Sequence, residues 1–240
     1  MERNQDEVLN NSHYNNSFGN YSRGEPPTAF LLFKTGICAI IIVAKKYSYE
    51  DNPYHFRRKI YMNYGDNCWV DMQQADKNKV VVVPLGSMEQ HGHHSPLLTD
   101  TYLVTVVAER VEQRLSDQLY LLPTLWLGAS DHHLDLPGTV SVPNHVYTLI
   151  IKNMVRSIAK AGFQRVFLLN GHGGNVVPGT QAITELANES DVYNNMWIAL
   201  SSYWTVAAPA MGPERHGMQT PQLSHACEYE TSMMLFLHGK

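Results

Sequence analysis

Histidine and carboxylate side chains gather in four short polar segments of this 240-residue chain. The segments are 86–100 (GSMEQHGHHSPLLTD), 130–139 (SDHHLDLPGT), 170–175 (NGHGGN) and 225–232 (HACEYETS). Imidazole and carboxylate together bind divalent Zn, Mn or Fe. The three cysteines are far apart and form no CxxC pair, which argues against a structural thiolate site. The pattern therefore predicts a catalytic metal site.

Residue spacing indicates which side chains could bind the metal. Glu89 and His91 are two residues apart, so in an extended loop they point the same way. Asp100 stands at the start of an expected helix, where a carboxylate could bridge two ions. His172 lies among glycines at 171, 173 and 174, which allow close approach of a ligand. Two ions sharing a carboxylate would activate a water molecule at neutral pH.

These polar segments follow expected strands. Short apolar runs predict strands at 79–84, 119–123, 165–169 and 196–203, and amphipathic spacing predicts helices at 100–115, 145–161 and 177–188. Strands that alternate with helices favour an α/β fold with a parallel sheet covered on both faces. Ligands of such sheets bind beyond the carboxyl ends of the strands. The first three segments and Trp204 all fall at that edge.

The first 68 residues are expected to be an N-terminal extension, followed by a domain at 69–240. The extension has a polar tail (1–27), an apolar run (28–44) and a linker (45–65). The apolar run contains Lys34 and is shorter than the roughly 20 residues of a spanning helix. A packed strand or an extension is favoured there, with a membrane anchor as the alternative. The net charge of -4 argues against a nucleic-acid binder, and a cytoplasmic location is expected.

The motifs resemble the creatininase family of metal-dependent amidohydrolases. The similar segments are PLGSMEQHGHHSPLLTD, LPGT, NGHGGN and HACEYETSMML, which span about 70% of the chain. The resemblance implies a three-layer α/β/α fold, a centre of two divalent ions, hydrolysis of a C–N amide bond, and assembly as a homo-oligomer, commonly a hexamer. The substrate implied is a small molecule with a cyclic amide or formamide group.

The resemblance also assigns residues. It implies metal binding by Glu89, His91, Asp100 and His172. Creatininase has a further glutamate where this chain has Gly174, and Glu228 is expected to replace it. His225 matches a histidine that moves a proton to the leaving nitrogen, and Glu230 is expected to orient it or the water. The expected substrate contacts are Ser130, His133 and Trp204.

Two departures from the family pattern leave alternatives open. A second pocket tryptophan of creatininase corresponds to Pro221, which argues against creatinine as the substrate. Relatives with the GHGGN motif act on formamides, on a peptide or on a keto-inositol, and the sequence does not choose among them. The chain also ends at Lys240, earlier than family members usually do. The domain is therefore expected to be C-terminally truncated, and the alternative function is metal binding without turnover.

Overall fold

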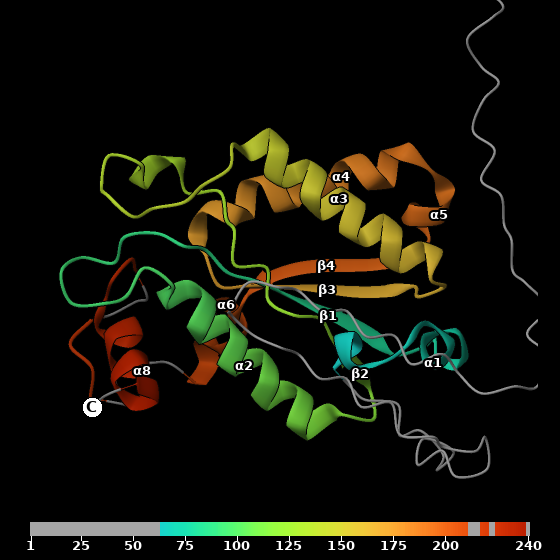
Figure 1. Ribbon diagram of the computed structural model, residues 1–240, viewed down its shortest axis with the longest axis horizontal. Coiled ribbons are helices and arrows are strands. Elements are labelled where there is room, and N and C mark those ends of the chain that lie inside the picture. The colour runs from blue at the N-terminus through green and yellow to red at the C-terminus, as the bar shows by residue number, and fades with distance from the viewer. Residues whose placement is uncertain (1–62, 211–216, 221–223, 239–240) are drawn as a thin grey trace, which may run out of the picture. The chain divides into compact units, whose positions relative to one another are not determined.

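A four-stranded parallel sheet forms the centre of the fold (Figure 1). The computed structural model describes residues 63–210, 217–220 and 224–238. The strands lie in the order β2-β1-β3-β4, and every adjacent pair is parallel. Their bounds are Val80–Leu85 (β1), Leu119–Leu121 (β2), Arg165–Asn170 (β3) and Trp197–Ser202 (β4). The predicted parallel sheet is confirmed.

The central strand β1 is buried on both faces. Val81 and Val83 belong to one hydrophobic core, and Val82 belongs to a second core on the other face. Side chains alternate across a strand, so an unbroken β-branched run suits a strand covered from both sides. This is why a continuous run of valines, without polar alternation, predicts the strand.

Helices cover both faces and complete three layers. Helices α3 (Asn144–Lys160) and α4 (Val176–Glu189) lie above the sheet in Figure 1. Helix α2 (Thr99–Leu115) lies below it and packs beside α8 (Glu228–His238). Helix α3 ends before Gly162, which has a φ of 94° that glycine adopts without strain. The predicted α/β/α architecture is confirmed.

The start of α2 differs from the sequence prediction. The expected helix begins at residue 100, whereas α2 begins at Thr99. Leu98 occupies the N-cap position and provides no side-chain hydrogen bond. Thr99 donates to the carbonyl of Pro96 instead. Asp100 is buried in the first turn, and its carboxylate faces His91 and His172. The residue that could have capped the helix is used for a different contact.

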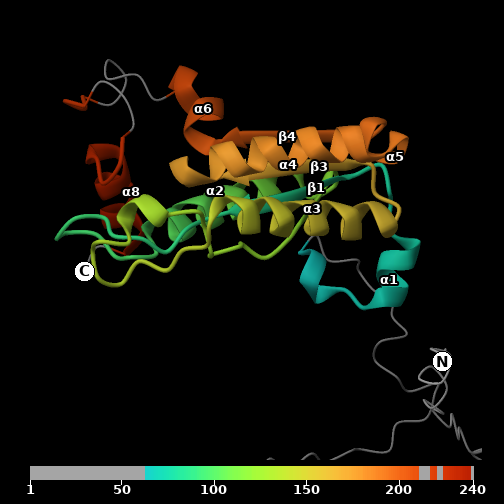
Figure 2. The ribbon, with the colours of Figure 1, turned by 90° about the horizontal axis from the view of Figure 1, so that it is seen from above.

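Asn63 and Tyr64 contact the sheet and its core. Asn63 forms a parallel bridge with Leu121, and the Tyr64 ring lies 6.5 Å from Tyr120 and 5.9 Å from Phe163. Helices α1 (Trp69–Gln74) and α5 (Asp191–Asn194) lie at the end of the sheet opposite α6 (Tyr203–Ala207) and α8 (Figure 2). No helix among the described residues is long and apolar enough to cross a membrane. The apolar run 28–44 lies outside those residues.

Candidate metal centre

A polar cavity opens at the carboxyl end of the sheet, as the sequence predicts. Its volume is about 310 Å³. Side chains from the loops after β1 and β3, from the 130–139 segment, from α6 and from α8 reach it. The lining includes Glu89, Asp100, His132, His133, His172, Trp204, His225 and Glu230. Segments separated by up to 141 positions in the sequence therefore meet at one place.

Asp100 lies between two histidines. Its Oδ1 is 3.1 Å from Nε2 of His91, and its Oδ2 is 2.9 Å from Nδ1 of His172. Burial raises the pKa of the Asp100 carboxyl, but the hydrogen bonds with His172 and His91 lower it by more, so the carboxylate form is favoured. Each oxygen of one carboxylate thus faces a different imidazole.

The other nitrogen of each imidazole faces a backbone carbonyl. Nδ1 of His91 is 3.2 Å from the carbonyl oxygen of Glu89, and Nε2 of His172 is 3.2 Å from that of Ala129. A carbonyl only accepts, so these nitrogens donate and the inner nitrogens carry the lone pair. A nitrogen lone pair and a carboxylate oxygen that face each other repel, because both are electron-rich. The arrangement is stable only with a cation between the two atoms. Without a metal that cation is a proton: burial lowers the pKa of His172, but hydrogen bonds with Asp100 and Glu89 raise it to about 10.

Glu89 contributes a buried oxygen that requires a partner. Its Oε1 lies 3.2 Å from Nδ1 of His172 and 3.4 Å from Nδ1 of His225. Its Oε2 is buried and has no hydrogen-bond partner among the described residues. An unsatisfied buried carboxylate oxygen is costly, and a bound cation would satisfy it. Glu89 therefore fits the role of a metal ligand.

The donor atoms form two groups that share Asp100. Glu89, Asp100 and His172 make one group, and His91, Asp100 and Glu230 make the other. Within each group the ligand atoms lie within 4.8 Å of one another. Two further groups contain Glu89, one with His91 and His225 and one with His132 and His133. The donor set suits divalent metals of the Zn, Mn or Fe type.

The two glutamates at the start of α8 have different surroundings. The sequence predicts Glu228 as a ligand, but its carboxylate accepts hydrogen bonds from the backbone N–H groups of Gln219 and Thr220. Glu230 is the buried carboxylate, with Oε2 4.0 Å from Nε2 of His91. Residues two apart on a helix point in nearly opposite directions, so Glu228 and Glu230 cannot both face the cavity. Burial, followed by the Asp100 charge, raises the pKa of Glu230 to about 7.

Ser130 lies behind the imidazole of His172 and not on the cavity wall. It is fully buried, and its hydroxyl is 3.1 Å from Nε2 of His172 and 2.6 Å from the hydroxyl of Ser87. In the structure the hydroxyl predicted to contact the substrate instead contacts the His172 ring and Ser87. Ser87 has no role in the sequence-based prediction, because an isolated serine after a strand carries no signal.

The glycine at position 174 is required by close packing. A Cβ there would lie 2.1 Å from the carbonyl oxygen of Ala129 and 2.5 Å from Nε2 of His172. Asn175 holds the same corner, because its side chain accepts from the N–H of Ala129 and donates to the carbonyl of Gly86. No larger residue fits this backbone, so the missing glutamate at this position has a structural reason.

His225 and His133 both line the cavity, and the His225 ring also lies 4.4 Å from the ring of His91, measured between centroids. The rings of His225 and His133 stack at a centroid distance of 4.4 Å. Burial, followed by the neighbouring His91, lowers the pKa of His225, which favours a neutral ring. Gln90 contacts both rings. Gln90 has no role in the sequence-based prediction, although it lies between Glu89 and His91.

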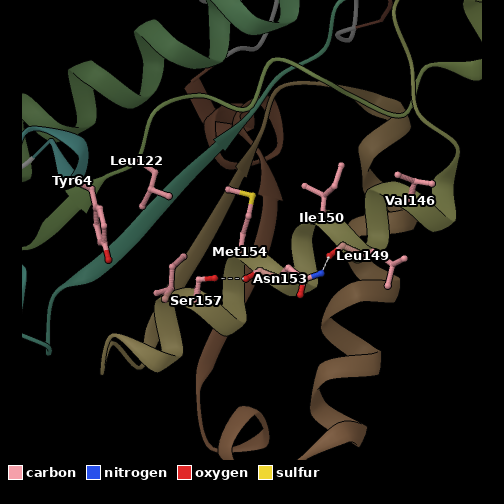
Figure 3. A pocket seen from close by; sticks show the side chains of 9 residues that line it. Tyr64, Leu122, Val146, Leu149, Ile150, Asn153, Met154 and Ser157 are labelled. Atoms are coloured by element: carbon pink, nitrogen blue, oxygen red, sulfur yellow. Dashed lines mark hydrogen bonds between the residues drawn. The ribbon is translucent and has the colours of Figure 1, made fainter. Parts of the chain in front are cut away.

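A larger hollow lies away from this centre, beside α3 (Figure 3). Its volume is about 580 Å³, and its lining is mostly apolar, with Tyr64, Leu122, Ile150 and Met154 pointing toward it. No histidine and no carboxylate lines it. It contains none of the metal-binding side-chain types that gather in the smaller polar cavity, which is therefore the candidate site.

The chain is similar in sequence to known proteins. Residues 66–240 match the family model Creatininase, described as creatinine amidohydrolase. The mycofactocin precursor peptide peptidase of Mycobacterium tuberculosis is 34% identical over 147 residues, which is 58% of this chain and 57% of that protein. The creatinine amidohydrolase of Pseudomonas putida is 30% identical over 188 residues, covering 72% of this chain and 71% of that one.

A solved structure is similar as well. A mutant creatininase of Zn-Zn type superposes with a TM-score of 0.65 at 28% identity and covers 74% of this chain and 73% of that chain. The match to the mycobacterial peptidase, by contrast, spans little more than half the length of that relative. The family model nevertheless covers well over half of the sequence and includes every candidate ligand. The chain belongs to the creatininase family.

Proposed function

We propose that this chain forms a metal-dependent hydrolase centre that cleaves the C–N bond of an amide. The observation that carries the proposal is the buried Oε2 of Glu89, which has no hydrogen-bond partner in the described part of the chain. It lies beside two imidazoles whose lone pairs face carboxylates. Such an arrangement is stabilised by cations. Family membership supports amide hydrolysis as the reaction.

The proposed ligands are Glu89, His91, Asp100, His172 and Glu230. We propose two divalent ions, because Asp100 presents one oxygen to each of the two donor groups. Glu230 takes the place that the sequence assigned to Glu228. Zn, Mn and Fe all suit these donors, and the similar creatininase structure of Zn-Zn type supports zinc.

The chain's side chains divide the remaining work. Bound divalent ions would supply Lewis acidity and lower the pKa of a water molecule. The outer hydrogen bonds of His91 and His172 hold both rings in the tautomer that binds cations. His225 lies at the cavity beside Glu89 and is our candidate for delivering a proton to the departing nitrogen. Trp204 and His133 wall the cavity and would position the substrate.

The proposed substrate is a small amide, of the cyclic amide or formamide type. A cavity of about 310 Å³ is at the lower end of the range for small-molecule sites. The similar mycobacterial protein is a peptide peptidase, so a peptide end entering the cavity belongs in the same test. We also propose that the chain forms a homo-oligomer. The exposed apolar side chains of Trp126, Leu134 and Leu136 support association, and light scattering of the purified chain tests it.

Metal content and activity together test the proposal. We expect about two ions per chain by elemental analysis, and hydrolysis of at least one amide in a panel of cyclic amides, formamides and short peptides. Glu230→Gln should lower the metal content toward one ion, and Glu228→Gln should leave it unchanged. His93→Ala, which alters an exposed histidine outside the donor groups, is the control.

The outcomes separate the candidates. Two bound ions with no turnover of any amide would favour the alternative, metal binding without catalysis. A chain that binds no metal, or that loses metal through Glu228→Gln but not through Glu230→Gln, would contradict the proposed centre.

A further inference from the structure

The side-chain amide of Gln90 lies between two imidazoles in a fixed orientation. Its Oε1 accepts a hydrogen bond from the backbone N–H of Gly92 at 2.9 Å. Its Nε2 lies 3.0 Å from Nδ1 of His133 and 2.9 Å from Nε2 of His225. Because the oxygen is engaged by an N–H group, the amide NH₂ faces both rings, and it can only donate.

This orientation determines where each ring carries its proton. A neutral imidazole has one N–H and one lone pair. The nitrogen that faces Gln90 must be the acceptor, so His225 is protonated on Nδ1 and His133 on Nε2. Those two nitrogens lie 3.4 Å and 3.9 Å from Oε1 of Glu89. Both N–H groups therefore point into the metal centre.

His91 and His172 have the opposite arrangement, since their inner nitrogens carry lone pairs. By distance alone His225 could also be a ligand, because it forms a compact donor group with Glu89 and His91. A ring that keeps its proton on the inner nitrogen cannot bind a cation there. The hydrogen-bond partner of the outer nitrogen, rather than distance, distinguishes the two kinds of histidine.

We propose that Gln90 is a positioning residue that withholds His225 and His133 from the metal and keeps them as N–H donors toward the substrate. The assignment of these N–H groups to the substrate rests on the proposed function. The tautomers themselves can be measured without substrate. In this state the two N–H groups would stabilise negative charge that develops on the amide. Delivery of a proton by His225 then requires its ring to leave Gln90 during turnover.

Exchange of the amide for a carboxylate tests the assignment. Gln90→Glu keeps nearly the same side-chain shape, but it replaces the NH₂ group that donates hydrogen bonds to the two rings with a carboxylate oxygen that accepts them. In metal-free protein with ¹⁵N-labelled histidine, above about pH 8 where ordinary rings are neutral, we expect His225 to be protonated on Nδ1 and His133 on Nε2. In Gln90→Glu both protons should move to the other nitrogen. Gln90→Leu should give mixed tautomers in both rings, which keeps the test available if the carboxylate variant does not fold.

Zinc and a matched variant complete the experiment. On adding Zn²⁺ to the native protein, His91 and His172 should show metal-bound nitrogens while His225 keeps its Nδ1–H. In Gln90→Glu, His225 should also become metal-bound. Gln181→Leu removes a surface amide that donates to Glu185, and it should change neither tautomer.

Two results would overturn the inference: tautomers that are unchanged by Gln90→Glu, or a zinc-bound Nδ1 of His225 in the native protein. Failure to hydrolyse any amide would count against the proposed function but would leave these spectra as they are.

Discussion

Alanine substitution of two adjacent glycines, Gly174 and Gly173, should affect stability very differently, because only the first is tightly packed. A Cβ at Gly174 would lie 2.1 Å from the carbonyl oxygen of Ala129 and 2.5 Å from Nε2 of His172, whereas a Cβ at Gly173 would meet nothing within 4 Å. Gly174→Ala and Gly173→Ala therefore add the same atoms to neighbouring positions of one turn.

The size of the effect follows from these distances. Nonbonded atoms prefer about 3.5 Å or more, so the Ala129 carbonyl would have to retreat by more than about 1 Å. Ala129 cannot move freely, because its backbone N–H donates to the side chain of Asn175 at 3.0 Å. The His172 ring is fixed by a hydrogen bond with Asp100 at 2.9 Å. Overpacking costs about 1–3 kcal/mol, and we expect about 3 kcal/mol for Gly174→Ala, or roughly a hundredfold in the folding constant. Gly173→Ala should stay within about 0.5 kcal/mol.

Urea unfolding of both variants in chelator, compared with the native chain, measures the stability difference. Competition titration with a zinc chelator measures the second expected effect. We expect the metal affinity of Gly174→Ala to be about 10–100-fold weaker, because the proposed ligand His172 is displaced. Equal unfolding midpoints for the two variants, or greater damage from Gly173→Ala, would refute the steric reasoning.

Two further predictions test contacts around the centre and on the outer helices. Ser130→Ala removes a hydroxyl that contacts His172 and Ser87; zinc affinity should fall about tenfold and the unfolding free energy by about 1 kcal/mol, and unchanged zinc affinity would exclude an orienting role. The pKa of the exposed Glu189 is lowered by its hydrogen bond with Arg156, against an opposing effect of desolvation, and also by its hydrogen bond with Lys152. Its stabilisation is thus present above the unfolded pKa near 4.5 and lost as the pH falls through the lower folded pKa. Thermal melts should show native protein more stable than Glu189→Gln at pH 7, with the gap closing below about pH 4, and a gap that widens in acid would contradict the ion pair.

The strands and helices could be predicted because their signals are local. The valine run of β1 is continuous because both of its faces are buried, and α3 stops where Gly162 can adopt a positive φ. The helix cap of α2 could not be predicted in the same way. Asp100 is an ordinary capping residue by type, and only its two histidine partners draw its carboxylate into the site.

The candidate site was predictable as a set of residues but not in every role. Glu228 and Glu230 are equally acidic in sequence, and the start of α8 decides which of them faces inward. Ser130 and Gln90 depend on partners more than 40 positions away in the sequence, namely His172 and His133. Roles set by such long-range contacts cannot be read from spacing.

The proposed ligand Glu230 links metal binding to the attachment of the last helix. Four of the proposed ligands lie on segments tied to the sheet, but Glu230 belongs to α8, which reaches the core through Met234 and leaves Leu235 and Phe236 largely exposed. An ion bound by Glu230 together with the other proposed ligands would therefore attach α8 to the rest of the domain. A partner that binds α8 in its docked position would strengthen metal binding. By thermodynamic reciprocity, the metal would strengthen binding of that partner by the same free energy. The oligomeric state and the metal content of this protein would then vary together if α8 lies at a subunit contact.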